Sequence, residues 1–228
     1  MNVLWDYREQ LLNGAVTTIW VSILTLFLST ALGLVVAGLA NAGGAGHALS
    51  RVYVEIFQNI PYLILVFIFY FGLAQVGLRL SAVQAVIVGL TLYSAAYTAE
   101  AVDSGIRGVS DGERRAAVAT GMDRLTILRA IVLPQAVVYC LPSLTNQWVR
   151  VIKNTTVLAV IGGGDLLYEA NLGSAETYQV FAFYGFVAVA YWILIIPLTR
   201  VSARAETVRA WRRAQLGLPT QQRTRRTA

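Results

Sequence analysis

Long stretches without formal charge dominate this chain and limit the folds that it can adopt. No Asp, Glu, Lys or Arg lies between Glu9 and Arg51, and segment 15–40 within this stretch is strongly apolar. About twenty apolar residues suffice for a helix to cross a bilayer. Gly33 and Ala37, one turn apart in this segment, favour close approach of a neighbouring helix. Since 57% of the residues are hydrophobic and 13% are charged, the sequence predicts one membrane-embedded domain.

Further uncharged runs predict an all-α membrane protein with about five transmembrane helices. The expected spans are 15–40, 56–78, 80–99, about 143–162 and 177–199. Pro61, near the entry of the second span, should end or kink a helix. Pro134 and Pro142 disfavour a straight span through this region. We therefore expect an interfacial helix that ends near Pro134 and a fourth span that starts near Ser143.

Basic residues indicate the orientation. Five arginines lie in segment 105–134 and eight lie from Arg200 to Arg226, whereas no basic residue lies between Gly162 and Arg200. Cytoplasmic loops are enriched in Lys and Arg, so segment 105–134 and the C-terminus are expected inside, which places the N-terminus outside. The expected organisation is one transmembrane domain, 1–204, and a basic cytoplasmic tail, 205–228, that is disordered. The net charge of +6 then comes from basic residues at the expected membrane edges, where they can contact lipid. Nucleic acid is not an expected partner.

Segment 105–134 has the local signals of two short helices. Ser110 followed by Glu113 is typical of a capping box, and Gly121 fits a left-handed helix end. Asp123 should cap a second helix, which Pro134 closes. Small side chains on the first helix would let another protein approach closely. The alternative interpretation is an ordinary polar connection.

Two basic residues, Arg150 and Lys153, fall near the middle of the expected fourth span. Ionisable groups are costly there and usually face water or a partner. Because they are three residues apart, they share a helix face. Arg150 is a candidate ligand for a substrate carboxylate, and Asn146 belongs to the same candidate pathway. The alternative is that Arg150 snorkels or is paired internally.

Several functions are excluded by the residues present. Cys140 is the only cysteine and His47 the only histidine, so no intramolecular disulfide and no multi-cysteine metal site can form, and a Ser-His-Asp triad is not expected. The only lysine, Lys153, does not end a Gly-rich phosphate loop. The chain is therefore not expected to be an enzyme or to hold a cofactor.

The spacing of segment 105–134 resembles the EAA loop of ABC importer permeases. Arg115-Ala116-Ala117, Gly121 and the run from Ile131 to Pro134 fall at the intervals of that motif. Flanking blocks are also similar to the polar amino acid branch of the family; these are Tyr97 to Ala101, Gly105 to Val109, Leu133 to Ala136, Pro142 to Gln147 and Lys153 to Thr156. The resemblance covers about 14–204.

Three positions depart from the family pattern. Arg115 stands at the motif's glutamate, and Glu113 lies about 200° away around a helix, so it cannot substitute. Gln58 and Asp103 each stand where an arginine is usual. These changes bear on the polar contacts with the partner ATPase.

The resemblance implies the permease subunit of an ATP-driven importer for polar amino acids, with glutamate as the favoured substrate, working by alternating access in a bacterial cytoplasmic membrane. It implies an extracytoplasmic amino acid-binding protein, a second copy or a homologous permease, and ATPase subunits that bind ATP and Mg. The residues that it assigns to ATPase coupling are Gly112, Glu113, Arg115, Ala116, Ala117 and Gly121. The alternative function is a secondary transporter or channel that works alone.

Overall fold

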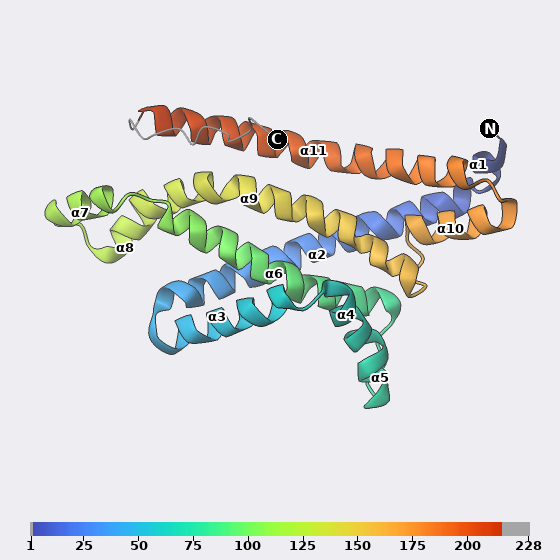
Figure 1. Ribbon diagram of the computed structural model, residues 1–228. Helices are drawn as coiled ribbons and strands as arrows, with labels where there is room; N and C mark the ends of the chain where they lie inside the picture. Colours follow the sequence, from blue (N-terminus) through green and yellow to red (C-terminus); the bar gives the residue numbers. More distant parts are fainter. Residues whose placement is uncertain (1, 216–228) are drawn as a thin grey trace, which may run out of the picture.

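The computed structural model describes residues 2–215, and all of its regular elements are helical. Long helices lie roughly side by side, with α7 and α8 at one end and α1 and α10 at the other (Figure 1). The bounds are α1 Asn2–Asp6, α2 Arg8–Ala42, α3 Gly44–Asn59, α4 Tyr62–Phe67, α5 Leu73–Gln75, α6 Ala82–Arg107, α7 Asp111–Ala119, α8 Arg124–Ile127, α9 Leu133–Asn154, α10 Leu166–Thr177 and α11 Val180–Gln215. Three tighter or wider turns join them; these are π-helical η1 Ile68–Gly72, π-helical η2 Leu128–Val132 and 3₁₀ η3 Thr155–Val160.

Four helical segments are long and apolar enough to cross a membrane. They are Arg8–Ala42, Ala82–Arg107, Arg124–Val160 and Val180–Arg204. A fifth candidate is the pair formed by Gly44–Asn59 and Tyr62–Gln75, which are bent by 96° relative to each other. The expected count of about five spans therefore holds if the bent pair is one span, and the all-α prediction is confirmed for the described residues.

The bend lies at Pro61, where the sequence predicts a helix end or kink. Ile60 is extended, with φ −94° and ψ 126°, as expected for a residue before proline. Pro61 is the N-cap residue of α4, a position at which its missing N–H costs no helical hydrogen bond. The second expected span, 56–78, is consequently divided at Pro61. Its first residues belong to the longer helix α3, which begins after the turn at Gly43.

The prediction that Pro134 closes a helix and that a new span begins near Ser143 is wrong. Helical structure continues from Arg124 to Val160. Pro134 stands directly after the wide turn η2, in which the Leu133 N–H reaches back to Leu128 O. A π-helical turn relieves the clash that a proline ring makes with the preceding turn. Pro142 is accommodated inside α9, where the Thr145 hydroxyl donates to the Leu141 and Pro142 carbonyl oxygens.

Close packing of α2 on α6 forms the centre of the bundle. Gly33 faces α6 so closely that a β-carbon at this position would lie 2.5 Å from Thr98 Cγ2 and 2.9 Å from Ala95 O. Ala37, one turn later, is 1% exposed. The predicted role of these two small residues is confirmed. Next to this contact, Val21, Val66, Val86, Leu90 and Val151 form a buried cluster that joins α2, α4, α6 and α9.

Helix α10 lies between the expected fourth and fifth spans, in a segment for which the sequence analysis expects no helix. Asp165 caps it by accepting from the Leu167 and Tyr168 N–H groups, and the Leu166 N–H donates to Thr18 Oγ1 of α2 at 3.1 Å. Asp165 is fully buried. Burial raises its pKa to about 6, against the lowering effect of the two N–H donors. The segment after Gly162 is thus an ordered cap on the end of the bundle.

The boundary expected at residue 204 does not coincide with a helix end. Helix α11 continues to Gln215, into the expected tail. Arginines spaced along this part of the chain are compatible with a helix, because Arg has a high helix propensity. Residues 216–228, for which disorder is predicted, lie outside the described residues.

Gly33 offers a direct test of the α2–α6 contact. We expect Gly33→Leu to lower stability by about 1–3 kcal/mol, because the side chain overpacks a site that leaves no room for a β-carbon. Gly38→Leu is the matched control, since nothing lies within 4 Å of a β-carbon there. Thermal unfolding of the purified chain in detergent should show a lower Tm for Gly33→Leu only; equal Tm values would contradict the packing.

Candidate functional site

The loop between α6 and α9 begins with the short helix α7. Ser110 caps it, since the Gly112 N–H donates to the Ser110 hydroxyl at 3.2 Å. The predicted capping box with Glu113 is not formed, because the Ser110 hydroxyl accepts from the Gly112 N–H and not from that of Glu113. Glu113 instead accepts a hydrogen bond from Gln135 Nε2 of α9. The carboxylate therefore ties α7 to the start of the long spanning helix.

Gly121 ends α7 as predicted. Its φ of 84° lies in the left-handed region that favours glycine. The Met122 N–H donates to Ala117 O at 3.2 Å and the Gly121 N–H to Val118 O at 3.0 Å, which is the Schellman pattern. Nothing lies within 4 Å of a β-carbon at this position. The requirement for glycine is thus conformational and does not come from a close contact.

Asp123 caps α8 as predicted. Its carboxylate accepts from the Leu125 and Thr126 N–H groups. The hydrogen bond from the Thr126 hydroxyl, together with these two backbone hydrogen bonds, holds the pKa of Asp123 below its usual range. Arg114 fixes α7 to α6, because its Nη2 donates to Ile106 O at 2.5 Å. The loop is therefore rigidly held on both sides.

The residues that the resemblance assigns to ATPase coupling do not all face outward. Gly112, Arg115, Ala116 and Gly121 are exposed, and Glu113 is half-buried. Ala117 is 5% exposed and packs against Val109, Ile127, Val132, Ala136 and Tyr139. A hollow of about 590 Å³, lined partly by Ala116, Thr120 and Gln135, lies beside α7. The helix thus has an inner anchoring side and an outer side available to a partner.

Arg115 is exposed and makes no ion pair or hydrogen bond with any described residue. Gln58 and Asp103, the other two departures from the family pattern, lie on α3 and α6. The Gln58 amide donates to Glu100 at 2.7 Å, and Asp103 pairs with Arg107 at 2.6 Å. Both side chains therefore contact groups of this chain, on α6.

Polar side chains form a row along α9. Asn146, Arg150 and Lys153 are all exposed, and their spacing places them on one face of the helix. We call these three residues the α9 row. The side chains of Asn146 and Lys153 make no hydrogen bond or ion pair with described residues. A spanning helix cannot present such a face to hydrocarbon at low cost, so the row must meet water or protein.

Arg150 does have an aromatic neighbour that the sequence analysis did not identify. Its guanidinium carbon lies 5.4 Å from the centroid of the Tyr97 ring, within cation–π range. The Tyr97 hydroxyl accepts from Tyr93 at 3.2 Å and donates to Gln58 O at 3.5 Å. The sequence signal for this arrangement is the i, i+4 spacing of Tyr93 and Tyr97 on one face of α6.

No group of three or more His, Cys, Asp or Glu side chains in the part of the chain that the structure describes has the arrangement of a metal site. The candidate site therefore consists of an exposed cationic row on a spanning helix and a rigid, outward-facing helix at one end of the bundle.

Comparison with known proteins agrees with this description. Residues 29–206 match the family described as "Binding-protein-dependent transport system inner membrane component". A probable glutamine ABC transporter permease protein of Bacillus subtilis is 40% identical over 200 residues, which cover 87% of this chain and 93% of the relative. The glutamine transport system permease protein of Escherichia coli is 30% identical, with 90% and 95% covered.

Solved structures show the same architecture. A chain described as the crystal structure of an amino acid ABC transporter with histidines superposes with a TM-score of 0.82 at 27% identity, covering 90% of this chain and 96% of that one. A methionine ABC transporter chain in an inward-facing conformation shares the fold, with a TM-score of 0.70 at 24% identity and coverage of 88% and 97%. The chain belongs to the family of inner membrane components of binding-protein-dependent transport systems, and the resemblance to amino acid ABC permeases is confirmed.

The conformation of Gly121 generates a prediction about α7. Gly121→Ala should strain the left-handed residue by about 1–2 kcal/mol and weaken the Schellman hydrogen bonds, whereas Gly121→Asn should be tolerated because Asn enters this region more readily. Hydrogen exchange of the Met122 amide would then be faster in the alanine variant and near wild type in the asparagine variant. Equal protection in all three proteins would show that the turn does not hold α7.

Proposed function

We propose that this chain is the membrane-spanning subunit of an ATP-driven importer for polar amino acids, with glutamine as its substrate. The observation that carries the proposal is Arg150, an exposed cation on a spanning helix. A water-filled pathway would supply the surroundings that such a group needs. The glutamine-type relatives support the substrate, and glutamate, which the resemblance favours, is the comparison substrate.

The α9 row is suited to recognise an amino acid. A guanidinium presents two parallel donors to a carboxylate and remains charged when partly desolvated. Tyr97 below Arg150 would hold the guanidinium plane in place, and the Asn146 amide, one turn away, supplies both a donor and an acceptor. Lys153 adds positive potential on the same face. Together these groups favour the carboxylate end of a polar amino acid.

Helix α7 is the proposed docking element for an ATPase subunit. Its outer side carries small residues, Gly112 and Ala116, which allow a close approach, and the unpaired Arg115 would meet an acidic residue of the partner. ATP and Mg would be bound by that partner, so that this chain itself carries out no hydrolysis. Gly121 and Asp123 keep α7 short and rigid, which a transmitted movement requires.

The contact between Glu113 and Gln135 gives the coupling a physical route. It joins α7 to α9, and Arg150 lies fifteen residues further along the same helix, or about 22 Å. Closure of the ATPase pair would displace α7 and, through this contact, tilt α9. The α9 row would then be accessible first from the outside and afterwards from the inside of the membrane, which is alternating access.

The proposed assembly places the loop and the C-terminus in the cytoplasm and the N-terminus outside, in a bacterial cytoplasmic membrane. The distribution of arginines supports this orientation. A second copy of this chain or a homologous permease would complete the pathway, since one chain leaves the α9 row open. An extracytoplasmic binding protein would deliver substrate at the α10 end.

The role of Arg150 is tested by Arg150→Gln in cells that express the chain with its ATPase and binding protein. Loss of a charge-assisted hydrogen bond is worth about 1.5–3 kcal/mol, so we expect the KM for glutamine uptake to rise about tenfold or more, with the amount of assembled complex unchanged. Arg79→Gln is the matched control, because Arg79 is exposed in the connection before α6. Unchanged affinity and selectivity of Arg150→Gln would show that the arginine is structural.

A further inference from the structure

A polar cavity of about 560 Å³ lies between the end of α2, α3 and the second half of α6. It belongs to the end of the bundle that carries the 105–134 loop, since α6 leads directly into that loop (Figure 1). The charged and polar residues at its wall include His47, Ser50, Arg51, Glu55, Glu100 and Asp103. Its volume falls in the range of small-molecule sites, about 300–1,000 Å³.

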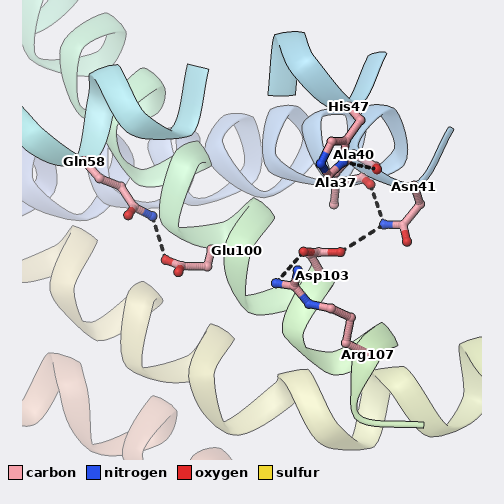
Figure 2. Close-up of polar contacts among 8 residues, drawn as sticks. All are labelled: Ala37, Ala40, Asn41, His47, Gln58, Glu100, Asp103 and Arg107. Carbon is pink, nitrogen blue, oxygen red and sulfur yellow. Dashed lines mark hydrogen bonds and ion pairs between the residues drawn. The ribbon is translucent and has the colours of Figure 1, made fainter. Parts of the chain in front are cut away.

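The α6 wall has one satisfied carboxylate and one that lacks a cation. Asp103 is paired with Arg107 at 2.6 Å and accepts from Asn41 at 3.3 Å (Figure 2). Among the described residues, Glu100 accepts only from the Gln58 amide, at 2.7 Å (Figure 2). A neutral amide does not compensate a negative charge. Glu100 therefore remains available to a positively charged group in the cavity.

The α3 wall carries three side chains without partners. Ser50 is 4% exposed, and its hydroxyl makes no hydrogen bond with any described residue. Arg51 and Glu55 lie one turn apart, yet neither forms an ion pair or a side-chain hydrogen bond within the described chain. The Ser50 hydroxyl oxygen keeps some contact with solvent, and Arg51 and Glu55 are exposed, so all three groups are accessible from the cavity. A ligand that both donates and accepts hydrogen bonds could therefore bind all three.

We propose that this cavity is a second binding site for a zwitterionic amino acid. The Arg51 guanidinium would take the α-carboxylate, Glu55 and Glu100 would take the α-ammonium group, and the Ser50 hydroxyl would donate to the ligand. Opposite charges on facing walls match the two charged ends of one small molecule. The unpaired carboxylates would repel a simple anion, and Arg51 would repel a simple cation. Neither kind of ion therefore fits the cavity as well as a zwitterion does.

Tyr97 links the cavity to the α9 row, although the residues that line the cavity come from α2, α3 and α6. Gln58, which lines the cavity, accepts through its carbonyl oxygen from Tyr97, the ring that lies against Arg150. In the proposed orientation this cavity lies on the cytoplasmic side of Arg150, so we include in the proposal a role as a site that the amino acid occupies on its way out. The role as an exit site rests on the proposed transport function, whereas binding itself depends only on the groups in the cavity.

Ligand protection of a cysteine in the cavity tests the proposal. Asn59→Cys in a Cys140→Ser background places a thiol at the cavity wall. In inside-out membrane vesicles that contain the full chain, 10 mM L-glutamine should slow its alkylation by a charged maleimide at least fivefold. L-Glutaminamide and N-acetyl-L-glutamine, which each lack one charged end, should protect at most weakly. Ser104→Cys, exposed on α6 outside the cavity, is the control and should react at an unchanged rate.

Removal of the proposed contacts should abolish the protection. Arg51→Gln and Glu100→Gln, each combined with Asn59→Cys, should react equally fast with and without L-glutamine. The proposal is overturned if L-glutamine leaves the Asn59→Cys rate unchanged, or if protection persists in both double variants. Ser50→Ala provides a milder test. We expect it to raise several-fold the L-glutamine concentration that gives half-maximal protection of Asn59→Cys.

The proposed function and the cavity fail in different ways. Glutamine uptake with no protection of Asn59→Cys would remove the second site and leave the transport function intact. Protection of Asn59→Cys in a chain that supports no uptake with its ATPase and binding protein would remove the transport function and leave the second site intact.

Discussion

The cost of placing ionisable groups in hydrocarbon is the constraint on which this structure depends most. Arg150 and Lys153 lie on a helix that is otherwise apolar enough to span a membrane, and the isolated chain leaves both exposed. Lipid is an unfavourable neighbour for either group. The α9 row is consequently the side of the molecule that must be covered by water or by another protein, while the apolar faces of α2 and α11 are suited to lipid.

The second requirement is a stiff connection between that row and the end of the bundle. Gly121, Asp123 and Arg114 each remove a degree of freedom from the α7 region, and Glu113 joins it to Gln135 on α9. Because α9 continues without interruption to Asn154, the proposed displacement of α7 would move the row as a unit. The bend at Pro61 leaves α3 packed on α6 beside the same route, with the polar cavity between them.

Local signals in the sequence are sufficient where a single residue decides the structure. Gly33, Gly121 and Asp123 behave as predicted because a missing side chain, a positive φ or a helix cap acts within one turn or one contact. The predictions at Pro134 and Glu113 are wrong because distant or irregular partners decide those positions, namely a π-helical turn and Gln135. Similarly, α10 depends on contacts with α2, such as Leu166 with Thr18, and the pairing of Arg150 with Tyr97 joins segments that no short-range pattern relates.

Water accessibility along α9 tests the central claim most directly. The experiment uses single cysteines in a Cys140→Ser background and labels them in membranes with a charged thiol reagent. Asn146→Cys reports on the α9 row, and Val137→Cys reports on an exposed but apolar position of the same helix. Gln179→Cys and Asp111→Cys serve as reference positions outside the spans. We expect Asn146→Cys to react nearly as fast as Gln179→Cys, Val137→Cys to react much more slowly, and Asp111→Cys to react only in inside-out vesicles. Equal unreactivity at Asn146 and Val137 would contradict a water-filled pathway, and labelling of Asp111→Cys in intact cells would contradict the orientation.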